Sequence, residues 1–170
     1  PTWPALDVRS IDGGFLVHTA VNLYGRHNVL NTLSAVAAAM EHVLSFDDIL
    51  IGAASFEGAY RRFNIVSTPD APITVIDDYA HHPTEVATNL EAAKLHFHGR
   101  RIVAVFRPHT YSRTRALMTE YHHALENADM AFITHIEVAR EAGAEQAGAG
   151  EDIARGLRDE EVYVRNINEH

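Results

Sequence analysis

A strand, a helix and a second strand follow one another in residues 73–106, which read ITVIDDYAHHPTEVATNLEAAKLHFHGRRIVAVF. The runs 73–77 and 102–106 are short, apolar and rich in β-branched residues, which is typical of buried strands. Between them, Pro83 stands where a helix would begin, and apolar residues then recur at helical spacing over 83–97. The segment therefore predicts a β–α–β unit with two parallel strands.

The same alternation continues toward the C-terminus. Further strands are predicted at 130–134 and 162–165, and further helices at 112–128 and 150–158. Strands and helices that alternate in this way form doubly wound, mainly parallel sheets. The fold class predicted for this part of the chain is therefore α/β.

The residues before this pattern have a different character. Gly13 and Gly14 predict the turn of a β-hairpin, and a short helix is predicted at 47–54. A longer helix between them is indicated by an apolar stripe at helical spacing, formed by Val29, Leu33, Val36, Met40 and Val43. The polar run 67–72 reads as a linker, so we expect a domain boundary near residues 65–70.

Composition narrows the classes of function. The 170 residues carry a net charge of −9, which argues against a general binder of nucleic acid or anionic membranes. No apolar run is long enough to predict a membrane span. The absence of cysteine excludes disulfides and thiolate-bound metals and fits a reducing compartment. The one lysine, Lys94, lies in a helical pattern without glycine, so a phosphate-binding P-loop is not expected in this chain.

Two polar clusters directly follow predicted strands, where ligands collect in open α/β sheets. The first, in 76–85, contains Asp77, Asp78, His81 and His82. The second, in 106–115, contains His109, Arg113 and Arg115. Strands joined by one crossover are usually neighbours, so we expect both clusters to face one cleft.

Several interpretations of these residues stay open on spacing alone. The carboxylates and imidazoles could hold a divalent metal, orient a nucleophile or bind ribose hydroxyls, or Asp78 could cap a helix beside solvated histidines. The arginines of the second cluster could bind carboxylates or phosphates, or form a solvated basic turn. Asn28 and Asn31 read as caps of the first long helix, and the arginine pair in 58–63 reads as a surface turn.

Four segments together resemble the Mur ligases. They are GRHNVLN (25–31), FEGAYRRF (56–63), DDYAHHPTE (77–85) and FRPHTYSRT (106–114), in this order. The resemblance covers about residues 20–165 and is strongest to the branch of the family that joins L-alanine to UDP-N-acetylmuramate in peptidoglycan synthesis. The murein-tripeptide ligases of cell-wall recycling are similar at DDYAHHP but lack the pattern formed by Pro108, His109, Ser112, Arg113 and Thr114.

The resemblance implies a piece of a larger cytoplasmic enzyme that uses ATP and Mg²⁺. Residues 1–65 would be the end of the central ATP-binding domain, and 66–170 would be a Rossmann-like C-terminal domain that is truncated at its end. The P-loop and the main Mg²⁺ ligands would lie in the missing central part, so no metal ligand is assigned in this chain. The partners would be the missing N-terminal and central domains, and the isolated chain is expected to be inactive.

The resemblance also implies a role for each residue of the motifs. The expected ATP-binding residues are Asn28 and Asn31 near the adenine, Arg62 at the phosphates and Asp78 at the ribose hydroxyls. The residues expected to line the pocket for alanine and an acyl phosphate are Tyr79, His81, His109 and Arg113, of which the last three are the candidate catalytic residues. Arg113 suits the alanine carboxylate, because a guanidinium binds a carboxylate with two hydrogen bonds.

Some positions depart from the family pattern. Arg107 stands where glutamine is common, Tyr24 stands where proline is common, and 135–137 reads His-Ile-Glu where Asp-Ile-Tyr is usual. These differences leave serine and glycine open as substrates.

Two other classes of function remain as alternatives. One is a metal-dependent phosphohydrolase built on Asp77, Asp78, His81, His82 and His109. The other is a stand-alone module that binds a nucleotide or an amino acid without catalysis.

Overall fold

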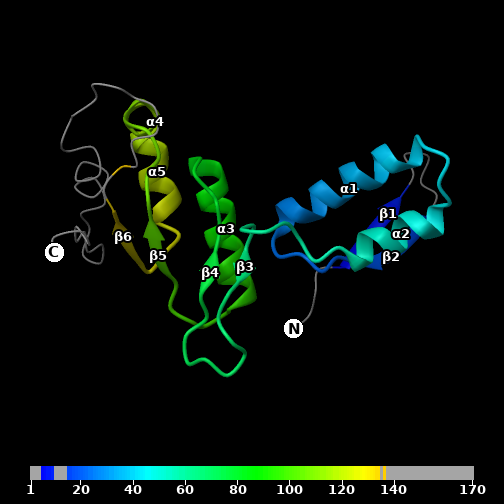
Figure 1. The fold of residues 1–170 in the computed structure, drawn as a ribbon, viewed down its shortest axis with the longest axis horizontal. Helices are drawn as coiled ribbons and strands as arrows, with labels where there is room; N and C mark the ends of the chain where they lie inside the picture. The colour runs from blue at the N-terminus through cyan, green and yellow to red at the C-terminus, as the bar shows by residue number, and fades with distance from the viewer. Residues whose placement is uncertain (1–4, 10–14, 135, 137–170) are drawn as a thin grey trace. The chain divides into compact units, whose positions relative to one another are not determined.

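The first strands of the chain form a hairpin. The computed structural model describes residues 5–9, 15–134 and 136, and within them β1 (Ala5–Arg9) pairs antiparallel with β2 (Phe15–Ala20). This pairing agrees with the hairpin predicted around Gly13 and Gly14, which themselves lie outside the described residues. The chain divides into two compact units, Pro1–Tyr79 and Ala80–His170 (Figure 1).

Two packed helices follow the hairpin in the first unit. They are α1 (Arg26–Met40) and α2 (Phe46–Ser55). The second begins where predicted, because the Ser45 hydroxyl accepts a hydrogen bond from the Asp48 backbone N–H at 3.2 Å. Asp47 and Asp48 place negative charge in its first turn, where the helix dipole favours it.

The apolar stripe predicted for α1 is only partly right. Val36 is buried, but Met40 is exposed and Val43 lies fully exposed beyond the end of the helix. The other buried residue of α1 is Thr32, whose hydroxyl donates to the Asn28 carbonyl oxygen at 2.8 Å. A buried threonine can replace an apolar residue because this local hydrogen bond satisfies its hydroxyl.

The predicted strand at 73–77 pairs with a partner that the sequence did not suggest. Its regular part is β4 (Ile76–Asp77), which pairs antiparallel with β3 (Asn64–Ile65). Further hydrogen bonds continue this pairing, from the Val66 N–H to the Val75 carbonyl oxygen and from the Val75 N–H to the Ser67 hydroxyl. The predicted linker 67–72 is therefore the connection of a hairpin, and the expected parallel pairing with 102–106 is wrong within the described residues.

The second unit contains a β–α–β arrangement, as predicted for the strands at 102–106 and 130–134. Its strands β5 (Val103–Phe106) and β6 (Met130–Ile133) pair in parallel, with Val103 opposite Met130. The unit begins with α3 (Pro83–His96), and Pro83 occupies the first turn as expected. The single helix predicted at 112–128 is two helices, α4 (Tyr111–Ala116) and α5 (Met118–Leu125), with Leu117 between them. The elements predicted at 150–158 and 162–165 lie outside the described residues.

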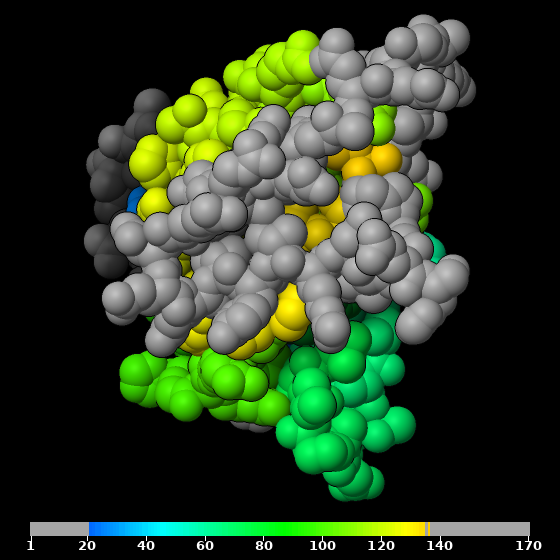
Figure 2. Space-filling view, turned by 90° about the vertical axis from the view of Figure 1, so that its left-hand side faces the viewer, coloured from blue at the N-terminus to red at the C-terminus, as the bar shows by residue number. Residues whose placement is uncertain are grey.

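One hydrophobic core joins the helices and strands of this unit. Helices α3 and α5 pack together, and α5 lies beside β5 in Figure 1. The buried core residues are Val86, Phe106, Tyr121, Ala124, Leu125, Ala131 and Ile133. On β5, Val103 and Val105 point away from this core and are exposed. Atoms of β6, coloured yellow to orange, reach the surface in Figure 2.

Candidate functional site

In the first unit, the start of α1 carries the two predicted asparagines. Helix α1 begins after Gly25, which has a φ of 85°, and no side chain caps it. Asn28 donates from Nδ2 to the Tyr24 carbonyl oxygen at 2.8 Å, and Asn31 donates from Nδ2 to Asn28 Oδ1 at 3.2 Å. The asparagines therefore brace the turn that leads into the helix, and the interpretation as N-terminal caps is wrong.

The segment around Phe63 is held in an uncommon backbone conformation. Arg61 and Phe63 have φ angles of 57° and 51°, which non-glycine residues adopt rarely. The Asp78 carboxylate accepts a hydrogen bond from the Phe63 N–H, and the Arg61 carbonyl oxygen accepts one from the Tyr79 N–H at 2.9 Å. Arg61 also pairs with Asp77, Nε to Oδ2, at 3.2 Å. These contacts compensate for backbone strain of a kind that often marks functional sites.

His27 lies in the same neighbourhood, and our sequence interpretation did not single it out. Burial lowers the pKa of its imidazole, the negative charge of Asp78 raises it, and the positive charge of Arg62 lowers it. Its Nδ1 atom is buried and has no hydrogen-bond partner among the described residues. The signal that could have found it is its place beside Asn28 in GRHNVLN.

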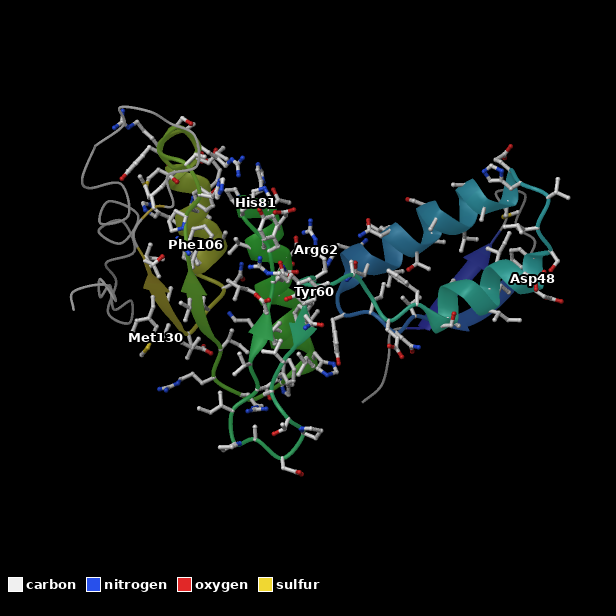
Figure 3. The ribbon with its side chains drawn as sticks, in the orientation of Figure 1. Asp48, Tyr60, Arg62, His81, Phe106 and Met130 are labelled. Atoms are coloured by element: carbon white, nitrogen blue, oxygen red, sulfur yellow. The ribbon has the colours of Figure 1, made fainter. Side chains whose placement is uncertain are left out.

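These groups offer the chemistry of a nucleotide site in one small region. The Tyr24 and Phe63 rings lie 4.8 Å apart. Arg62, which is labelled in Figure 3, is exposed. A neutral imidazole and an amide can hydrogen-bond to a purine, a guanidinium can bind phosphates, and a carboxylate can accept from ribose hydroxyls. The four predicted ATP-binding residues, Asn28, Asn31, Arg62 and Asp78, all belong to this unit.

In the second unit, the start of α3 is capped by His82. Its Nδ1 accepts a hydrogen bond from the Thr84 N–H at 3.3 Å, and Glu85 Oε2 accepts one from the His82 N–H at 3.2 Å. This reciprocal pair is a capping box, in which the histidine takes the place of the usual serine or threonine. The suggestion that Asp78 could cap this helix is therefore wrong, since that carboxylate binds the Phe63 N–H.

His81 lies just before the cap and is held by two side chains. Glu85 Oε2 accepts a hydrogen bond from the His81 N–H at 3.0 Å and lies 3.6 Å from Nδ1 of its ring. The Tyr121 hydroxyl donates to the His81 carbonyl oxygen at 2.6 Å. Burial raises the pKa of Tyr121, while the charge of Arg113 lowers it and that of Glu85 raises it. His81 and Arg113 therefore both lie near the Tyr121 hydroxyl.

The second predicted cluster forms a compact turn after β5. Pro108 and Thr114 are fully buried, and the Thr114 hydroxyl donates to the Thr110 carbonyl oxygen at 2.7 Å. Thr110 has a φ of 67°, which is unusual for a β-branched residue. Nη1 of Arg113 is buried and has no hydrogen-bond partner among the described residues, so an anion there would satisfy it.

The predicted site residues are thus divided between the two units. Asp77, Asp78 and Tyr79 belong to the first, and His81, His109 and Arg113 belong to the second. Within the described ranges, no group of three or more His, Asp or Glu side chains is arranged to hold a metal ion. Asp77, Asp78 and His82 are engaged by Arg61, Phe63 and Thr84, so the geometry does not favour the phosphohydrolase alternative. Among the helices that the structure describes, none combines the length and apolar character needed to cross a bilayer.

Comparison with known proteins gives a consistent result. The family model described as "Mur ligase, glutamate ligase domain" matches residues 61–169. A UDP-N-acetylmuramate–L-alanine ligase from Delftia acidovorans is 43% identical over 157 residues, which cover 88% of this chain and 33% of the relative. An enzyme of the same name from Gloeobacter violaceus is 45% identical over 145 residues, which cover 85% of this chain and 31% of the relative.

Solved structures agree with the sequence relatives. The crystal structure of a UDP-N-acetylmuramate-alanine ligase from Thermotoga maritima matches with a TM-score of 0.73 and 30% identity, and covers 91% of this chain and 33% of that one. The chain thus spans about a third of the length of the curated relatives it matches. Together with the parallel β5–β6 pair, these likenesses show an α/β fold of the Rossmann-like kind.

Proposed function

The chain belongs to the Mur ligase family, and we propose that it is part of a UDP-N-acetylmuramate–L-alanine ligase. This ATP-dependent enzyme would join L-alanine to the carboxylate of UDP-N-acetylmuramate in the cytoplasm, as a step of peptidoglycan synthesis. The shared name of relatives at 43% and 45% identity supports this choice over the murein-tripeptide ligases. Residues 1–65 would be the end of the central domain and 66–170 the C-terminal domain, with the rest of the enzyme as their partner.

In this proposal the first unit contributes to ATP binding. Asn28 and Asn31, together with His27, would lie at the adenine, Asp78 at the ribose and Arg62 at the phosphates. The buried, unpartnered Nδ1 of His27 supports the fit, because a purine supplies the hydrogen-bonding group that the described residues do not. ATP supplies the phosphoryl group that activates the muramate carboxylate. Mg²⁺ would be held mainly by the missing part of the enzyme.

The second unit would position the amino acid. The alanine amine attacks the acyl phosphate, the new C–N bond forms, and phosphate leaves with the electron pair of the broken C–O bond. Such a reaction depends mostly on positioning and on neutralising negative charge. Arg113 would bind the alanine carboxylate, with His81 and His109 beside the reacting groups. The observation that carries this assignment is the buried Nη1 of Arg113, which has no partner among the described residues.

The test is Arg113→Ala in the complete enzyme, with Arg115→Ala as the matched control. Arg115 is an exposed arginine of the same short helix. A hydrogen-bonded charge pair is worth about 1.5–3 kcal/mol, so Arg113→Ala should raise the KM for alanine by roughly 10- to 100-fold. The KM for ATP should stay within about twofold, and the control should change neither constant.

Two results would contradict the proposal. An unchanged alanine KM and kcat in Arg113→Ala would remove this arginine from the amino-acid site. Amide formation by the wild-type enzyme with the cell-wall tripeptide, and none with alanine, serine or glycine, would assign it to the recycling branch. The assay should measure phosphate release with each amino acid. The isolated 170-residue chain should release no phosphate.

A further inference from the structure

His81 is held by hydrogen bonds at its N–H and its carbonyl oxygen, and Glu85 also lies within ion-pair distance of its ring. Glu85 supplies two of these contacts through one oxygen, which accepts from the His81 N–H at 3.0 Å and lies 3.6 Å from the ring Nδ1. Tyr121 supplies the third, a 2.6 Å hydrogen bond to the carbonyl oxygen. The bond from the His81 N–H is part of the way Glu85 caps α3, whereas the ring contact and the bond from Tyr121 are additional to that cap.

The position of Glu85 has a consequence for the proton on the imidazole. A neutral imidazole carries one N–H and one lone pair, and an ionised carboxylate can only accept a hydrogen bond. The nitrogen that faces Glu85 is therefore favoured as the N–H, which leaves the lone pair on Nε2. In other enzymes a carboxylate hydrogen-bonded to the imidazole sets the tautomer of a functional histidine.

Tyr121 adds rigidity from a distant part of the chain. Its side chain is fully buried, and its ring centroid lies 5.2 Å from that of Phe106 in the core. Because burial raises its pKa, the hydroxyl keeps its proton and remains a donor at neutral pH. Helix α5 thereby fixes the main chain of a residue that is 40 positions earlier in the sequence.

We propose that Glu85 and Tyr121 are positioning residues for the ligase reaction, with Glu85 holding His81 as the Nδ1–H tautomer and Tyr121 holding its main chain. This inference rests on the proposed function. Nε2 of His81 then accepts a proton from the ammonium group of the amino acid, which frees the nitrogen lone pair for attack on the acyl phosphate. The imidazolium that forms is stabilised by the Glu85 carboxylate.

The direct test is the tautomer of His81 in the 170-residue chain, read by ¹⁵N NMR of the imidazole nitrogens at a pH where the ring is neutral. We expect the proton on Nδ1. In Glu85→Gln the preference should weaken, since an amide can donate as well as accept. Glutamine still serves a capping box, so helix α3 should keep its start. A proton on Nε2 in the wild-type chain would overturn the proposal, whatever the enzyme's activity.

Kinetics of the complete enzyme give the second test. Glu85→Gln should lower kcat with alanine by about tenfold or more, with the KM for ATP unchanged. Tyr121→Phe keeps the buried ring, and should lower kcat by roughly threefold to tenfold through the lost hydrogen bond. Glu91→Gln, an exposed carboxylate on the same helix, is the control and should behave as wild type. Equal kcat values for Glu85→Gln and the control would overturn the positioning role.

These outcomes separate the two proposals. A wild-type enzyme without alanine-dependent activity would refute the proposed function. The tautomer of His81 would then still decide whether Glu85 sets the proton position. Full alanine-dependent activity with the proton on Nε2 would support the proposed function and refute the role of Glu85.

Discussion

His27 shows how burial and two opposite charges act on one imidazole. Burial lowers its pKa most strongly, the Asp78 carboxylate raises it, and the Arg62 guanidinium lowers it. The folded protein therefore keeps this ring neutral at a pH where an exposed histidine would begin to accept a proton. A neutral ring in this place costs less to bury than a charged one.

This balance predicts opposite shifts in two variants. Asp78→Asn removes the charge that raises the pKa of His27, so the pKa should fall further. Arg62→Gln removes a charge that lowers the pKa, so the pKa should rise. NMR titration of the His27 ring protons measures both shifts, and a shift in the same direction in both variants would contradict the arrangement.

The same histidine makes stability depend on pH. Its folded pKa lies below the unfolded value of about 6.5. The contribution of His27 to the free energy of unfolding is therefore fully present above the unfolded pKa, and it is lost as the pH falls toward the folded pKa. Urea unfolding between about pH 7 and 5 should show a decline in the free energy of unfolding. His27→Gln should reduce this slope, and an unchanged slope would show that His27 stays solvated.

Single residues were predicted from the sequence with uneven success. Pro83 at the start of a helix was predictable because its fixed φ and missing N–H suit that position. The role of Asp78 was not predictable, because its hydrogen bond to the Phe63 N–H spans 15 residues and depends on the hairpin between them. His27 was missed for a related reason, since only the folded chain brings Asp78 and Arg62 near it.

Among the elements, α5 holds the second unit together. Its residues Tyr121, Ala124 and Leu125 are all buried against α3 and the β5–β6 pair. A helix this short, Met118–Leu125, has little stability of its own and depends on such packing.

Removal of the Leu125 side chain from this core should be costly. Leu125 is 1% exposed, and Leu→Ala at such sites costs about 2–5 kcal/mol, because a cavity remains. Leu95→Ala on α3 is the control, since Leu95 is 77% exposed and its change should stay within about 0.5 kcal/mol. Chemical denaturation of both variants measures the difference. Similar free energies of unfolding would contradict the core described here.

The start of a helix could be predicted from the sequence where a neighbouring residue determines it. Helices α2 and α3 begin where their capping residues stand, within one residue of the predicted starts. The break at Leu117 between α4 and α5 has no glycine or proline to signal it, so it was missed. The strand at 73–77 was recognised, but its antiparallel partner was not, because β3 is only two residues long and has no strand pattern.

As a whole, the molecule divides into two compact units, Pro1–Tyr79 and Ala80–His170. The family model starts at residue 61, and our predicted boundary lies near 65–70. The hairpin of β3 and β4 explains why these positions differ, since it places residues after the predicted boundary in contact with residues before it.

Two units of this kind should respond separately to damage in their cores. Leu125→Ala should speed amide hydrogen exchange in β6 and α5 and leave α1 unchanged, while Val36→Ala should do the reverse. Hydrogen exchange measured by mass spectrometry on peptides from each unit tests this. Equal acceleration in both units by either substitution would show that they unfold as one cooperative body.

The one lysine offers a practical route to observing this protein at work. Lys94 is exposed in the last turn of α3, and the chain has no cysteine. Within this segment an amine-reactive dye can therefore modify only one side chain, and a thiol-reactive dye only a cysteine introduced by design. A donor dye on Lys94 and an acceptor on a cysteine placed in α2 would turn the distance between the two units into a fluorescence signal, read while nucleotide and amino acid are added.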